Sequence, residues 1–143
     1  MTRVDFYVLQ DVDQMAAHRF ACRLALKAMT AGNAVHLHTD DAAAANEVDD
    51  LLWQYPEQRF IPHDREDALT GAARVVVGWN PPPAPDGLLI NLASTVPTFF
   101  GRFERVAEIV VQARAADMRS RYRFYRDRGY PLFDHRLDDW EAA

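Results

Sequence analysis

Short apolar segments alternate with longer stretches that carry helix signals, and this alternation constrains the fold more than any other feature. It is typical of strands joined by helices that each bury one face on the sheet. Such βαβ connections are right-handed and make the strands parallel. The sequence therefore predicts an α/β fold: a single domain over residues 1–143, with a largely parallel Rossmann-like sheet flanked by helices. The expected strands are Val4–Leu9, Ala34–His38, Val75–Val77 and Leu88–Leu92.

The first expected helix has clear signals at both ends. Asp11 or Asp13 can cap its N-terminus, and Gly32 can end it in the left-handed conformation. Its core-facing side chains are expected to be Met15, Phe20, Cys22, Leu24, Leu26 and Met29. Cys22 is therefore expected to act as a small core hydrophobe.

The remaining elements are marked mainly by prolines. Thr39 or Asp40 can cap the second helix, which Pro56 is expected to end. Phe60–Pro62 is expected to be extended, as a short edge strand. Pro97 is expected to open a long C-terminal helix, because proline is favoured in the first helical turn. The inner stripe of that helix would be Phe100, Phe103, Val106, Ala107 and Val110.

Composition and missing motifs exclude several functions. The net charge of -5 argues against a protein that coats nucleic acid, and a single cysteine excludes a disulfide framework. The turn Gln10–Asp13 lacks the glycines that a bound pyrophosphate needs, and neither Ser94 nor Ser120 lies in a nucleophile elbow. We therefore expect no cofactor and no catalytic residues. No apolar run is long enough to span a bilayer, so we expect a cytoplasmic protein without a membrane partner.

A metal-dependent hydrolase is the main alternative from another functional class. His36 and His38 lie two residues apart and would share one face of a strand, as metal ligands could. Asp40 follows at the carboxyl end of that strand, where α/β sites often lie. However, His63 and His135 belong to unrelated segments, so the sequence brings no further histidine to this position. We expect that neither metal nor nucleotide is required.

A basic stretch stands out within this acidic chain. Residues 112–128 contain six arginines and only two aspartates. If the C-terminal helix continues through them, Arg119, Tyr122, Arg123 and Arg126 share one face. Guanidinium groups beside an aromatic ring suit an acidic peptide with an aromatic end. They also suit a single-stranded nucleic acid, which leaves direct nucleic-acid binding as a further alternative. A solvated helix end is the simplest explanation of the same pattern.

A second candidate site combines Leu51–Trp53 with Phe60–His63. A tryptophan at a helix end beside an extended Phe-x-Pro segment is by itself more typical of a core position. It is also compatible with a rigid aromatic anchor for a partner protein. The pattern alone therefore favours the core and leaves the anchor as the alternative.

Several segments, in this order and spread over nearly the whole chain, resemble the chi subunit family of bacterial DNA polymerase III. Each is short, but the ordered set is fairly specific. The segments are Asp5–Leu9, Leu52–Pro56, Phe60–His63, Leu89–Leu92, Arg121–Arg126 and Gly129–Tyr130.

The resemblance implies a non-catalytic accessory subunit of the DNA polymerase III holoenzyme, which contacts DNA only indirectly. Such a subunit links the clamp-loader complex to the acidic C-terminal tail of single-stranded-DNA-binding protein, which ends in a phenylalanine. Carried over by position, Arg119, Tyr122 and Arg123 would line the tail site, with Arg126 at its rim and Gly129–Tyr130 beside it.

Two further implications concern other positions. The family often has a basic residue one turn before Arg119, where this chain has Ala115 with Arg114 next to it. Trp53, Phe60 and Pro62 match the family surface that docks the psi subunit or, in competition, a repair helicase.

Overall fold

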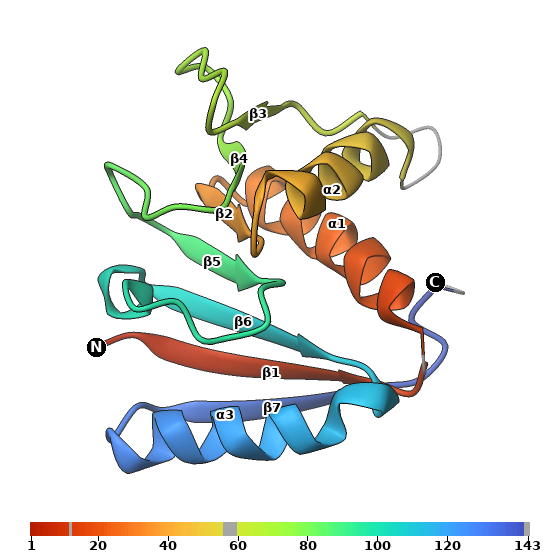
Figure 1. Ribbon diagram of the computed structural model, residues 1–143, viewed down its shortest axis with the longest axis vertical. Coiled ribbons are helices and arrows are strands. Elements are labelled where there is room, and N and C mark those ends of the chain that lie inside the picture. The colour runs from red at the N-terminus through yellow and green to blue at the C-terminus, as the bar shows by residue number, and fades with distance from the viewer. Residues whose placement is uncertain (12, 56–59, 142–143) are drawn as a thin grey trace.

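The computed structural model describes residues 1–11, 13–55 and 60–141, and these form one parallel seven-stranded sheet (Figure 1). The strand order is β3-β4-β2-β5-β6-β1-β7, and every neighbouring pair is parallel. The strands are β1 Arg3–Leu9, β2 Val35–His38, β3 His63–Arg65, β4 Val75–Gly78, β5 Leu88–Asn91, β6 Arg105–Val110 and β7 Leu132–Leu137. The helices are α1 Gln14–Thr30, α2 Ala42–Gln54 and α3 Ala115–Asp127, with 3-10 turns at Phe100–Arg102 and Gln112–Arg114. The predicted α/β class with a parallel sheet is confirmed.

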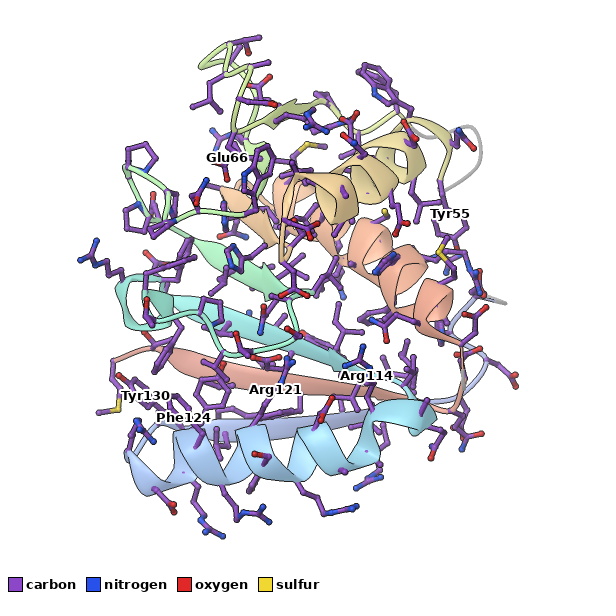
Figure 2. All side chains as sticks on the ribbon, in the orientation of Figure 1. Tyr55, Glu66, Arg114, Arg121, Phe124 and Tyr130 are labelled. Carbon is purple, nitrogen blue, oxygen red and sulfur yellow. The ribbon has the colours of Figure 1, made fainter. Side chains whose placement is uncertain are left out.

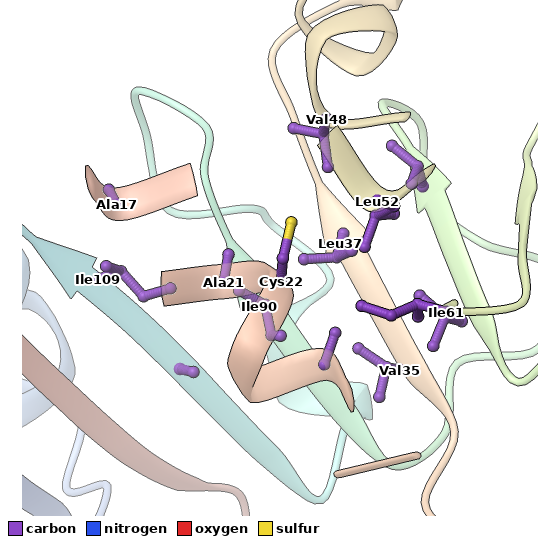
Figure 3. Close-up of a cluster of buried hydrophobic side chains, with 14 of the residues drawn as sticks. Ala17, Ala21, Cys22, Val35, Leu37, Val48, Leu52, Ile61, Ile90 and Ile109 are labelled. Atoms are coloured by element: carbon purple, nitrogen blue, oxygen red, sulfur yellow. The ribbon is translucent and has the colours of Figure 1, made fainter. Parts of the chain in front are cut away.

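Helices cover both faces of the sheet, and each face has its own hydrophobic cluster (Figure 1). On one face, α1 and α2 pack on β2, β4 and β5, with Cys22, Leu37 and Leu52 among the fully buried residues (Figure 3). Burial raises the pKa of the Cys22 thiol to about 12, so it stays protonated and acts as the expected core residue. On the other face, α3 and the segment before β6 enclose Phe6 and Tyr125.

The helix ends follow the capping signals only in part. Asp13 caps α1 by accepting a hydrogen bond from the Met15 amide, and Gly32 follows the helix with a φ of 93°. The N-cap of α2 is Asp41, which directly follows the predicted candidates Thr39 and Asp40, and the helix ends at Gln54. Pro56 lies outside the described residues. Met15 was expected in the core but is 42% exposed, because it lies in the first turn of α1, at the end of the sheet.

The prediction of a helix that opens at Pro97 is wrong. Residues 100–102 form a 3-10 turn, residues 105–110 form the interior strand β6, and α3 begins only at Ala115. Val106 and Val110 both face α3, while Ala107 and Ile109 face α1. Residues four apart share a face in a strand as well as in a helix, so this pair fits both periods. The β-branched residues of this segment favour the strand.

Two edge strands also differ from the sequence prediction. The short edge strand expected at Phe60–Pro62 lies three residues later, at His63–Arg65, where β3 pairs with β4. The last strand along the chain, β7, was not predicted, and it pairs with β1. The β7 residue His135 contacts the buried Asp5 carboxylate at 2.8 Å, and that carboxylate also accepts hydrogen bonds from Arg3 and Arg105. None of the helices in the described ranges has the length and hydropathy to cross a membrane.

A buried polar network attaches α3 to the centre of the sheet. Glu108 on β6 is fully buried, and its carboxylate accepts hydrogen bonds from Arg121 at 2.6 Å, Tyr125 at 2.6 Å and Asn91 at 3.0 Å. Arg121 also donates to the Ala93 carbonyl at 2.8 Å. Burial and the adjacent Glu108 charge raise the pKa of Tyr125, so its hydroxyl remains a donor. A buried carboxylate needs this full set of donors, because desolvation is otherwise unfavourable.

We predict that Arg121→Ala lowers the free energy of unfolding by about 3 kcal/mol, because it leaves Glu108 without its cationic partner. Tyr125→Phe should cost about 1–3 kcal/mol for the lost donor. Arg123→Ala is the matched control, since the exposed Arg123 side chain should change stability by less than about 0.5 kcal/mol. Urea unfolding followed by circular dichroism measures all three. Equal stability of the Arg121 and Arg123 variants would contradict the anchoring role of the network.

Candidate functional site

One side of α3 presents the predicted basic residues to solvent. Arg119, Arg123 and Arg126 are exposed, and Tyr122 is half-buried with its ring 5.5 Å from that of Phe6 on β1. Within the part of the chain that the structure describes, Arg119 and Arg123 have no hydrogen bond or ion pair. Arg126 pairs with its neighbour Asp127 at 3.1 Å. The surface formed by Arg119, Tyr122, Arg123 and Arg126, here called the α3 flank, thus combines two unpaired guanidinium groups with an immobilised ring.

Tyr130 lies at the C-terminal end of α3. Gly129 has a φ of 80°, which a residue with a side chain rarely adopts, and this turn directs the chain from α3 into β7. The Tyr130 ring packs edge-on against Phe100 at 5.0 Å and is half-buried. Only part of this ring is therefore accessible beside the α3 flank.

The opposite side of α3 faces the loop between β5 and β6, and the arginines on it are already paired (Figure 2). Arg121 binds Glu108 there, and Arg114 forms an ion pair with Asp117 at 3.0 Å. Arg114 and Arg121 both line the hollow on this side. They are therefore separated from the α3 flank, although the sequence shows all these arginines in one run.

A second exposed surface contains aromatic residues at the end of α2. Trp53 is 56% and Phe60 is 59% exposed, and their rings lie 5.2 Å apart. The neighbouring Leu52 and Ile61 are fully buried, so the segments alternate between core and surface. Pro62 is also exposed. We call the surface formed by Trp53, Phe60 and Pro62 the aromatic patch.

A hydrogen-bonded histidine gives the aromatic patch a fixed base. His63 contacts the Asp49 carboxylate and the Ile61 carbonyl, both at 2.7 Å, and its ring meets that of Trp53 at 4.9 Å. Asp49 belongs to α2, so this contact holds the extended segment against the helix. Rigid exposed aromatic side chains of this kind are typical of protein-binding surfaces.

The three residues of the hydrolase alternative do not converge on a common point. His36 and His38 are buried beside Phe99, and their rings stack on each other, with His36 Nε2 3.4 Å from His38 Nδ1. Asp40 is exposed, and its carboxylate accepts hydrogen bonds from the amide and hydroxyl of Ser94. In the described ranges, no three histidine, cysteine or acidic side chains are grouped so that they could hold a metal ion. The geometry therefore gives this alternative no support.

Burial, together with the nearby His38, lowers the pKa of His36 to about 4, so His36 is neutral in the folded protein at pH 7. The unfolded chain binds a proton at His36 below about pH 6.5, so stability falls as the pH drops from there towards 4. His36 alone should lower the free energy of unfolding by about 2 kcal/mol between pH 7 and pH 5. His36→Leu should remove this part of the dependence in urea titrations at the two pH values. An unchanged pH dependence in the variant would show that His36 is accessible to protons in the fold.

Comparisons with known proteins agree with the resemblance. The family described as "DNA polymerase III chi subunit, HolC" matches residues 1–133. The chain is 47% identical over 142 residues to the DNA polymerase III subunit chi of Pseudomonas aeruginosa, covering 96% of this chain and 98% of that protein. It is 28% identical to the subunit chi of Haemophilus influenzae, with 89% of this chain and 92% of that protein covered. For the Escherichia coli protein of the same name, the values are 27%, 92% and 96%. The chain therefore belongs to the DNA polymerase III chi subunit family, whose members are accessory proteins of DNA replication.

Proposed function

We propose that this protein is a non-catalytic accessory subunit that links the clamp loader of DNA polymerase III to single-stranded-DNA-binding protein. It does so in the cytoplasm by binding the acidic C-terminal tail of that protein. The observation that carries the proposal is the α3 flank, where the unpaired Arg119 and Arg123 lie beside the half-buried Tyr122. Family membership supports the same role.

Each group of the α3 flank suits one part of such a tail. A guanidinium can bind a terminal carboxylate through two parallel hydrogen bonds, and we assign this contact to Arg119. Tyr122 is held against Phe6, so its ring offers a fixed wall for the terminal aromatic side chain. Arg123 and Arg126 lie at the rim, where they can attract the aspartates of the tail. Because Arg126 already pairs with Asp127, its contribution should be the smaller.

We predict that Arg119→Ala weakens binding of a labelled peptide Asp-Asp-Asp-Pro-Phe by about ten- to a hundredfold, the equivalent of one charge-assisted hydrogen bond. Arg126→Ala should cost less and should lose its effect in high salt, because it acts by long-range attraction. Fluorescence anisotropy at two salt concentrations measures both variants. Equal small losses that vanish in high salt would mean that the basic face is diffuse and that Arg119 has no specific carboxylate contact.

Direct binding of single-stranded nucleic acid is tested in the same series. A protein that binds the phosphate backbone through several arginines should lose affinity steeply as salt rises and should show little preference for the peptide. The net charge of -5 argues against a protein that coats a nucleic-acid backbone. The unpaired Arg119 beside the half-buried Tyr122 ring instead suits the terminal carboxylate and aromatic side chain of the peptide. An oligonucleotide that competes with the peptide at physiological salt would reverse this preference.

We propose that the aromatic patch docks a psi subunit or a repair helicase. Phe60→Ala should weaken that binding by at least about tenfold, because exposed aromatic anchors carry much of the binding energy in protein interfaces. Peptide binding at the α3 flank should be unchanged, and thermal stability should fall little, because Phe60 is mostly exposed. Titration with psi subunit and a thermal melt test both parts. Loss of partner and peptide binding together with a large loss of stability would show that Phe60 has a structural role instead.

A further inference from the structure

The edge strand β7 adds a basic side chain next to the α3 flank. The pairing with β1 places Asp134 beside Phe6 and Arg136 beside Val8. Because paired residues of parallel strands point to the same face, Asp134 and Arg136 lie on the face that α3 covers, where Phe6 packs against Tyr122. Arg136 is exposed.

The register of α3 on the sheet brings Arg119 to the same corner as Arg136. α3 runs antiparallel to the strands and packs against β7 (Figure 1). The Tyr122 ring marks the level of Phe6 and Asp134. One turn back along the helix, Arg119 lies about 4.5 Å further on, and the step from Asp134 to Arg136 covers about 6.6 Å in the same direction. Arg119 and Arg136 are therefore at nearly the same level, one on the helix and one on the strand beside it.

Both guanidinium groups lack a partner in the described part of the chain, since neither Arg119 nor Arg136 makes a hydrogen bond or ion pair there. Three other arginines of α3 and the turn before it are paired: Arg114 with Asp117, Arg121 with Glu108 and Arg126 with Asp127. The nearest acidic residue on the same face of β7 is Asp134, two residues before Arg136, which pairs with Phe6 at the level of Tyr122. Two positive charges at one corner repel each other, so an anion bound between them is favoured.

The helix offers no alternative cation in this direction. Ala115, one turn before Arg119 on the same side of α3, is uncharged. Arg114 lies on the other side, paired with Asp117. On this side of α3, the unpaired cation next to Arg119 is therefore Arg136 on β7.

We infer that Arg136 is a further basic residue of the tail site and binds an aspartate carboxylate of the acidic segment, while Arg119 binds the terminal carboxylate. This assignment rests on the proposed function. It extends the tail site from the α3 flank onto the edge strand β7, on the same face of the sheet.

The two carboxylate roles can be separated with two peptides, Asp-Asp-Asp-Pro-Phe and Asn-Asn-Asn-Pro-Phe, both with a free C-terminus. Arg136→Gln should weaken binding of the aspartate peptide about three- to fivefold, as expected for loss of an exposed ion pair, and should leave binding of the asparagine peptide unchanged. Arg119→Ala should weaken binding of both peptides. Arg74→Gln is the control for loss of one charge. Arg74 is exposed and precedes β4, near the edge of the sheet opposite to β7.

Arg136→Gln should melt at the temperature of the unchanged protein, because the side chain has no partner to lose. Binding of the aspartate peptide by Arg136→Gln at wild-type affinity would overturn the inference and leave the proposed function intact. The same loss in Arg74→Gln would also overturn it, since the effect would then be one of net charge. If the unchanged protein binds neither peptide, the proposed function itself fails.

Discussion

The buried carboxylate of Glu108 is the interaction on which the rest of the structure depends. It lies on β6, an interior strand of the sheet, and accepts hydrogen bonds from β5 and from two positions of α3. A charge in the interior is tolerated only with a complete set of partners, so the position of α3 on the sheet is well specified. The α3 flank, the turn at Gly129 and the start of β7 all depend on that position.

This anchor also divides the arginines of residues 112–128 between two tasks. Arg121 points towards the sheet and serves the fold, and Arg114 pairs with Asp117 on the same side. Arg119 and Arg123 point away and are unpaired among the described residues. A helix places residues three and four apart on one side, so a run of closely spaced arginines necessarily supplies both sides. One side of the basic stretch thus holds α3 on the sheet, and the other side is a candidate binding surface.

The two candidate surfaces lie at opposite edges of the sheet (Figure 1). The aromatic patch adjoins β3, the first strand in the spatial order, and the α3 flank adjoins β7, the last. The patch is apolar and rigid, whereas the flank is basic, so they suit partners of different chemistry. This separation is compatible with the proposed adaptor role, because two partners could bind without overlapping.

The sequence alone determined the α/β class, the first helix with its caps, and the strands β1, β2, β4 and β5, because local periodicity and capping residues act within a few residues of the chain. It also identified the residues of the α3 flank and of the aromatic patch, although their roles remain predictions. It misassigned β6 because Val106 and Val110 share a face in a helix and in a strand alike. The β-branched residues of the segment gave a local preference for a strand. The tertiary structure made the strand necessary, since β6 is buried on both faces and pairs with β1 and β5. The tertiary structure also determined the positions of Arg121 and Arg136. Arg121 turns inward to pair with the buried Glu108, and the pairing of β7 with β1 places Arg136 at the edge of the sheet. Both placements depend on contacts between distant segments, which local patterns do not contain.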